Sequence, residues 1–108
     1  MSVNVSFFGN MPDGKEVRLF TVKNSNGIIL QVITLGATLQ ALYTPDKYGR
    51  VNDITVGFDS LYGHLNFTDY QGKTVGRYAN RIANGSFVMN GKKVQLTRNE
   101  KGRTCLHS

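Results

Sequence analysis

The sequence predicts an all-β chain built from antiparallel strands. Three observations support this class: β-branched and aromatic residues gather in short runs, 12 glycines provide turns between the runs, and no segment keeps a sustained helical period. The chain has 108 residues, which is enough for one domain with a modest core. Its 40% hydrophobic and 19% charged residues are typical of a globular chain and not of a disordered one.

The first third of the chain carries the clearest strand patterns. Residues 1–15 are weakly patterned, whereas residues 16–23 alternate between polar and apolar side chains and predict a half-buried strand. Asn26-Gly27 then favours a hairpin turn, because both residues tolerate positive φ. Residues 28–35 are β-branched and almost entirely apolar, so we expect a central, well-buried strand there.

Further strands follow in the middle of the chain. The small residues at 36–38 predict a bulge or a close approach of backbone, and residues 39–44 resume an extended pattern. Residues 45–50 form a loop with Pro and Gly, and residues 51–58 predict another strand. Asp59 is then placed to cap a single helical turn.

Positive charge is concentrated at the C-terminal end. The net charge is +6, but residues 73–108 hold eight cations and one acid, whereas residues 1–72 hold five cations and six acids. Such a basic segment can be a nucleic-acid binding surface or the exposed edge of a larger structure.

The sequence favours a cytoplasmic protein. No apolar run has the length of a membrane span, a single Cys105 cannot form an internal disulfide, and the N-terminus lacks a signal-peptide pattern.

The densest group of polar chemistry lies at residues 76–85, Gly-Arg-Tyr-Ala-Asn-Arg-Ile-Ala-Asn-Gly. Arg81 offers five donors in a planar fork, and Asn80 adds a donor and an acceptor on a short arm. A site for a neutral polyhydroxyl compound needs this mixture. Taken without further context, the same segment is also compatible with a solvated basic turn.

The other titratable residues predict no additional site. His64 is interpreted as an ordinary loop histidine, and Cys105 with His107 has no second Cys or His cluster, which argues against a zinc site. No glycine loop of the phosphate-cradling kind is present. The aspartates fit turns and strand edges: Asp46, Asp53, Asp59 and Asp69.

Residues 74–85, Thr-Val-Gly-Arg-Tyr-Ala-Asn-Arg-Ile-Ala-Asn-Gly, closely resemble the motif of the aldose 1-epimerases, also called galactose mutarotases. That family pattern continues with a strand, an Asn-Gly hairpin, a strand, an Asn and a Leu-His pair. The matching parts of this chain are residues 87–89, Asn90-Gly91, residues 94–96, Asn99 and Leu106-His107. The resemblance implies an antiparallel β-sandwich of the galactose mutarotase type, incomplete here, with residues 1–108 as the N-terminal portion of a single domain.

The resemblance also implies a function. Aldose 1-epimerases interconvert the α and β anomers of hexoses such as galactose and glucose, without a metal or cofactor. Carried over to this sequence, Asn80, Arg81 and His107 are substrate-binding residues. The family uses a Glu base and a His acid that lie well downstream of the Leu-His pair, so none is expected before Ser108 and this chain alone is expected to be inactive.

Two other functions remain as alternatives. One is a non-catalytic sugar-binding or regulatory module of the same fold. The other is a small basic β-barrel that binds nucleic acid, with Tyr70, Tyr78 and Phe87 as stacking platforms. The motif match argues against nucleic acid as a partner.

A segment of a larger sandwich exposes strand edges and apolar faces. We therefore expect marginal stability of this chain or its self-association.

Overall fold

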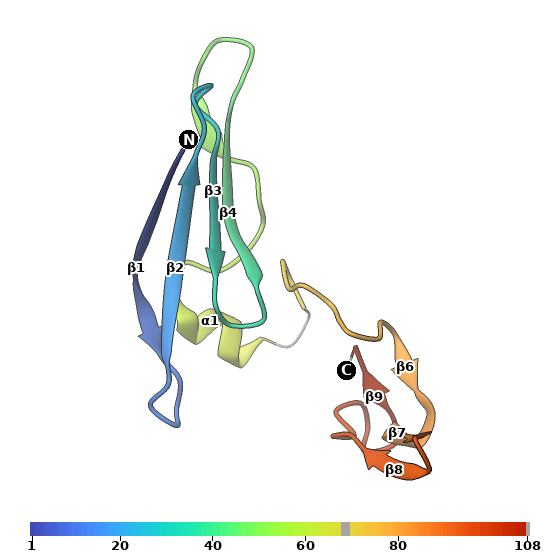
Figure 1. The fold of residues 1–108 in the computed structure, drawn as a ribbon. Coiled ribbons are helices and arrows are strands. Elements are labelled where there is room, and N and C mark those ends of the chain that lie inside the picture. Colours follow the sequence, from blue (N-terminus) through green and yellow to red (C-terminus); the bar gives the residue numbers. More distant parts are fainter. Residues whose placement is uncertain (68–69, 108) are drawn as a thin grey trace. The chain divides into compact units, whose positions relative to one another are not determined.

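The computed structural model describes residues 1–67 and 70–107. Thr68, Asp69 and Ser108, which include one predicted turn aspartate and the last residue of the sequence, lie outside the described residues. The chain divides into two compact units, Met1–Thr74 and Val75–Ser108, here called the N-terminal and C-terminal units (Figure 1). All strand pairs in both units are antiparallel, which confirms the predicted all-β class.

The N-terminal unit is a five-stranded sheet in which neighbouring strands follow one another in chain order, β1-β2-β3-β4-β5. The first four of these strands are labelled side by side in Figure 1. Asn24 fixes the turn between β2 and β3, because its Oδ1 accepts hydrogen bonds from the backbone N–H groups of Asn26 and Ile28, each at 2.9 Å. The elements of this unit are β1 (Ser2–Asn10), β2 (Glu16–Lys23), β3 (Ile29–Ile33), β4 (Thr38–Pro45), β5 (Val51–Asp53) and α1 (Leu61–Asn66).

Three predictions for this sheet need correction. β3 is the central strand, as predicted, but of its residues only Ile33 is buried and the others are half-buried. β5 ends at Asp53, well before the predicted residue 58, because the Asp53 carboxylate accepts a hydrogen bond from the Thr55 N–H and turns the chain. Gly36 and Ala37 lie in the turn between β3 and β4 with φ of 62° and 45°, and not in a bulge. The other predicted possibility, a close approach of backbone, is present, because the Thr74 N–H donates to the Gly36 carbonyl oxygen at 3.2 Å.

The sequence prediction missed β1. Within residues 1–67 and 70–107 this strand pairs only with β2, so it is an edge strand there, and most of its side chains are exposed. The alternation of Val3, Val5 and Phe7 with polar residues is the signal that identifies it.

The core of the N-terminal unit lies between the sheet and α1. Val17, Ile33 and Leu61 form its buried apolar cluster. Gly9 allows α1 to approach β1 closely, since a Cβ at this position would lie 2.8 Å from the Leu61 Cδ2. A helical turn after Asp59 is confirmed, although the N-cap is Ser60 and no side chain caps it by a hydrogen bond.

The prediction of His64 as a loop residue is wrong. His64 lies in α1, is only 4% exposed, and its Nε2 donates a 2.6 Å hydrogen bond to the Gln40 Oε1. Gln40 in turn donates to the Phe58 carbonyl oxygen, and the Phe58 ring packs edge-on against the imidazole. Burial, with a smaller contribution from the positive charge of Lys73, lowers the pKa of His64 below its usual value.

This histidine predicts a pH-dependent stability. Because the folded-state pKa of His64 is lowered, the unfolded chain binds the proton more readily, and the free energy of unfolding falls as the pH drops through about 6.5, the ordinary histidine value, towards the folded pKa. Thermal melts between about pH 7.5 and 5 measure this loss. His64→Gln should remove it, and the matched control His107→Gln should retain it. An identical pH profile for His64→Gln and the unchanged chain contradicts the prediction.

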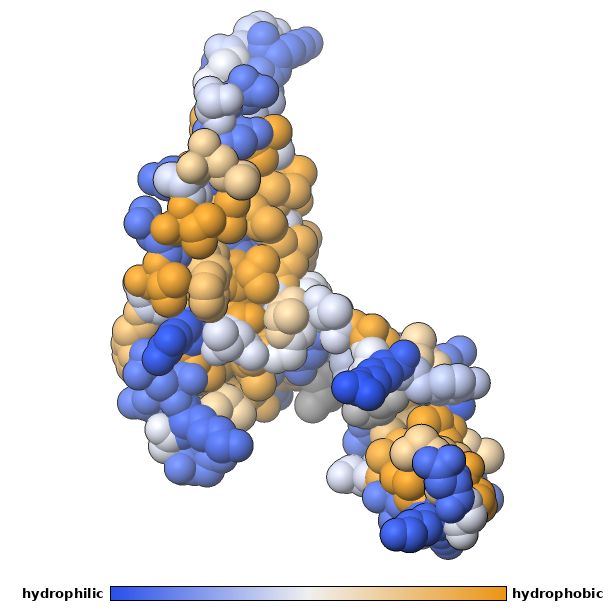
Figure 2. All heavy atoms as spheres, viewed as in Figure 1, coloured by the Kyte–Doolittle hydropathy of each residue, from blue (hydrophilic) through white to orange (hydrophobic). Residues whose placement is uncertain are grey.

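The edge of the sheet carries exposed apolar side chains. On β1, Val3, Val5 and Phe7 are 55%, 52% and 62% exposed, and apolar residues cover much of the visible surface of this unit (Figure 2). In the described residues, no helix is long and apolar enough to cross a membrane. An edge strand with unpaired backbone groups and apolar side chains is a site for pairing with another chain.

We therefore expect the chain to self-associate through β1 as its concentration rises. Val5→Lys should lower the associated fraction in sedimentation velocity, because a lysine on an edge strand opposes pairing. Tyr48→Lys, which adds the same charge at a 71% exposed residue in a turn, is the control and should leave association unchanged. Equal effects of the two substitutions would mean that net charge, and not the edge, governs association.

Candidate functional site

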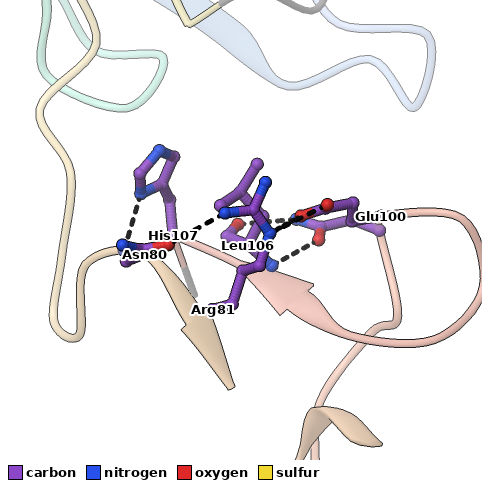
Figure 3. A network of polar contacts seen from close by, with 6 residues as sticks. Asn80, Arg81, Glu100, Leu106 and His107 are labelled. Atoms are coloured by element: carbon purple, nitrogen blue, oxygen red, sulfur yellow. Dashed lines mark hydrogen bonds and ion pairs between the residues drawn. The ribbon is translucent and has the colours of Figure 1, made fainter. Parts of the chain in front are cut away.

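The C-terminal unit brings the three predicted site residues together. β6 (Arg81–Ile82) pairs with β9 (Cys105–Leu106), with Arg81 opposite Leu106 and Ile82 opposite Cys105. Asn80 precedes β6 and His107 follows β9, so an antiparallel pairing places both beside Arg81 at one end of this ladder (Figure 3).

Asn80 and His107 hold each other by two hydrogen bonds. The His107 backbone N–H donates to the Asn80 carbonyl oxygen at 2.7 Å, and the Asn80 backbone N–H donates to the His107 Nδ1 at 2.9 Å (Figure 3). Nδ1 is therefore the acceptor atom of the His107 ring in this pair. Both residues have positive φ, 67° for Asn80 and 62° for His107, a conformation that gathers at functional sites.

Arg81 is held from one side by Glu100. The Arg81 Nε lies 2.9 Å from the Glu100 Oε1 and 2.7 Å from Oε2, and its Nη1 donates to the Asn80 Oδ1 at 3.2 Å. The Arg81 side chain is 56% exposed, but that of Glu100 is only 21% exposed. The guanidinium is thus fixed at its Nε end, and these contacts use two of its five N–H groups.

Glu100 is the site residue that sequence reasoning missed. Its signal was present in the charge pattern, since it is the only acid in residues 73–108. A tight loop fixes its backbone: the Glu100 N–H donates to the Thr104 carbonyl oxygen at 3.2 Å, and the Arg103 N–H donates back to the Glu100 carbonyl oxygen at 3.0 Å. Asn99 ties this loop to β9, because its side chain exchanges two hydrogen bonds with the backbone of Leu106, at 2.6 and 2.9 Å.

The second half of the motif is structural. Asn84 and Gly85 turn the chain with φ of 57° and 63°. Their carbonyl oxygens are bound from β8 and the segment after it: the Gln95 Nε2 donates to Gly85 at 3.2 Å, and the Arg98 Nε donates to Asn84 at 3.1 Å. β7 (Ser86–Met89) and β8 (Lys92–Gln95) follow as the predicted hairpin. Asn84 therefore serves the turn, whereas Asn80 and Arg81 belong to the polar cluster.

A groove of about 450 Å³ adjoins this cluster. It is lined by Tyr78, Arg81, Ile82, Ala83 and Phe87. Tyr78 and Phe87, which the nucleic-acid hypothesis used as stacking platforms, are 62% and 41% exposed. Aromatic faces beside polar donors suit a ligand with both C–H and hydroxyl surfaces. Across the parts of the chain that the structure describes, no group of three or more His, Cys, Asp or Glu residues could hold a metal ion.

The turn at Gly85 allows a direct test of the scaffold. A Cβ there would lie 3.1 Å from the Arg98 Cγ, and φ is +63°, so Gly85→Ala should lower the free energy of unfolding of this unit by about 1–3 kcal/mol. Gly91→Ala is the matched control, because φ is +76° but no atom lies within 4 Å. Urea unfolding measures both. If Gly91→Ala costs as much as Gly85→Ala, the close approach to Arg98 contributes nothing.

Comparison with known proteins identifies relatives. The family model for aldose 1-epimerase matches residues 18–108. Galactose mutarotase from Bos taurus is 40% identical over 108 residues, which cover 99% of this chain and 31% of that protein. Galactose mutarotase from Homo sapiens is 38% identical over 101 residues, 93% of this chain and 29% of that protein. The chain thus spans less than a third of the length of these relatives.

Solved structures agree with this assignment. The crystal structure of a GalM/aldose epimerase homologue from C. elegans has a TM-score of 0.67 at 32% identity and covers 96% of this chain and 28% of that one. Galactose 1-epimerase from Lactobacillus acidophilus has the same TM-score of 0.67 at 23% identity, covering 98% of this chain and 30% of that one, a likeness of fold alone. With the family model matching most of its residues, this chain belongs to the aldose 1-epimerase family.

Proposed function

We propose that this chain supplies sugar-binding residues of an aldose 1-epimerase that acts on hexoses such as galactose and glucose. The observation that carries the proposal is the convergence of Asn80, Arg81 and His107 at one end of the β6–β9 ladder. Family membership and the names of the galactose mutarotase relatives support it.

The cluster is rich in hydrogen-bond donors. Arg81 has N–H groups beyond the two that its contacts use. The Asn80 Oδ1 accepts from Arg81, which orients the carboxamide so that its Nδ2 is a donor to ligands. Sugar hydroxyl and ring oxygens are acceptors, so this set of donors matches an aldose. The groove with Tyr78 and Phe87 adds apolar surface for the C–H face of a sugar ring.

The same contacts suit binding better than proton transfer. Interconversion of anomers needs a base at the anomeric hydroxyl and an acid at the ring oxygen. Glu100 is mostly buried and engaged by Arg81, and the Nδ1 of His107 is occupied by the Asn80 N–H. We therefore propose that the acid and the base come from outside residues 1–108, and that the chain alone binds sugar without catalysis.

Sugar binding can be tested by NMR titration of the isotope-labelled chain with galactose and glucose. We expect shifts in the amide signals of residues 80, 81 and 107, and Arg81→Ala should weaken binding roughly tenfold, the effect of losing a charge-assisted hydrogen bond. Lys93→Ala, which removes an exposed cation on β8, is the control and should bind as the unchanged chain does. No shift at high millimolar sugar would refute the proposal.

Polarimetry on freshly dissolved α-galactose tests the catalytic part separately. The chain should leave the rate of mutarotation at the buffer value. An increase that scales with chain concentration and is lost in His107→Ala would show that the acid–base pair lies within these 108 residues after all.

A further inference from the structure

Glu100 is an isolated acid in a strongly basic unit. Residues 75–108 hold seven cations and this one acid. Lys101 and Arg103, its near neighbours in sequence, are exposed, yet the carboxylate pairs with Arg81. The one negative charge of the unit therefore lies against the one arginine of the proposed sugar site.

The contact balances the charge of Arg81 at its Nε end, where Glu100 is the less exposed partner. Both Glu100 oxygens lie within 2.9 Å of the Arg81 Nε, and Oε2 is buried without a hydrogen bond from the described residues. The charge of that carboxylate is thus balanced chiefly by the guanidinium. At the same time the contact fixes the plane of the guanidinium, and with it the Nη1 donor that orients the Asn80 side chain.

A neutral ion pair binds neutral sugars and sugars with a carboxylate differently. Hydroxyl groups need only donors in the right directions, which the Arg81–Glu100 pair provides. A ligand carboxylate at the exposed side of Arg81 is attracted by the guanidinium but repelled by Glu100 a few ångströms behind it. An arginine without this partner would favour the anion, because a charged acceptor binds guanidinium more strongly than a neutral one does.

We propose that Glu100 is a specificity-determining residue that sets this site to prefer neutral aldoses over aldoses bearing an acid group. The inference rests on the proposed function, since it concerns the ligand class of the same cluster. It also goes beyond sugar binding, because it names the residue and the charge by which uronic acids are disfavoured.

The test compares binding of galactose and galacturonate by NMR titration at low salt. Glu100→Gln keeps the size of the side chain but removes the charge, so the preference for galacturonate relative to galactose should rise about 3- to 10-fold, and less so at high salt. Glu16→Gln is the matched control. It makes the same change in net charge at an exposed pair with Arg18 in the other unit, and should shift the ratio less than about twofold.

The outcomes separate the two proposals. Suppose that Glu100→Gln binds galactose and that its preference for galacturonate over galactose equals that of Glu16→Gln. The inference is then overturned, while sugar binding stands. If the unchanged chain binds neither sugar, the proposed function fails and the inference with it. The unchanged chain gives an independent test should Glu100→Gln not fold: at low salt it should bind galacturonate no more tightly than galactose, despite a net charge of +6. If the unchanged chain bound galacturonate about tenfold more tightly than galactose, the inference would be overturned, since Glu100 would then not offset the attraction of Arg81 for the ligand carboxylate.

Discussion

The two-residue ladder between β6 and β9 is the constraint on which the candidate site depends. A short antiparallel pair is weak by itself, so its geometry must be supported by surrounding contacts. Here Cys105 is 2% exposed in the pairing with Ile82, and Asn99 binds both backbone groups of Leu106. These contacts fix β9 against β6, and only then do Asn80 and His107 reach each other.

The ion pair of Arg81 and Glu100 extends that constraint to the side chains. An arginine on a surface strand samples many rotamers, and ordering it costs conformational entropy before any ligand arrives. A largely buried carboxylate at the Nε end removes much of that freedom in advance. Preorganised donors lose less entropy when a ligand binds, which is how a modest number of hydrogen bonds can hold a polar ligand in water.

Local sequence chemistry predicted the parts of the fold that are fixed locally. Asn90-Gly91 forms the predicted hairpin, with φ of 52° and 76° at the two residues. The strand length after residue 53 and the burial of His64 were wrong for different reasons. The strand ends at a local hydrogen bond from the Thr55 N–H to the Asp53 carboxylate, which the apolar pattern of residues 54–58 masked, whereas the burial of His64 depends on Gln40, a residue distant in sequence. For the site, the family motif indicated Asn80, Arg81 and His107. No local pattern, however, predicts which of the seven cations in residues 75–108 forms the ion pair with Glu100.

Composition and local geometry also differ in what they indicate about partners. The positive charge concentrated in residues 73–108 suggests an anionic ligand, yet two of the arginines there make contacts within the chain. Arg98 donates to the Asn84 carbonyl oxygen and supports the turn, and Arg81 is paired with Glu100. Charge that is engaged in this way contributes to the long-range field but not to a specific contact with an anion. Under the proposed function, the ligand class of the candidate site follows from how Arg81 is paired and not from how many cations surround it.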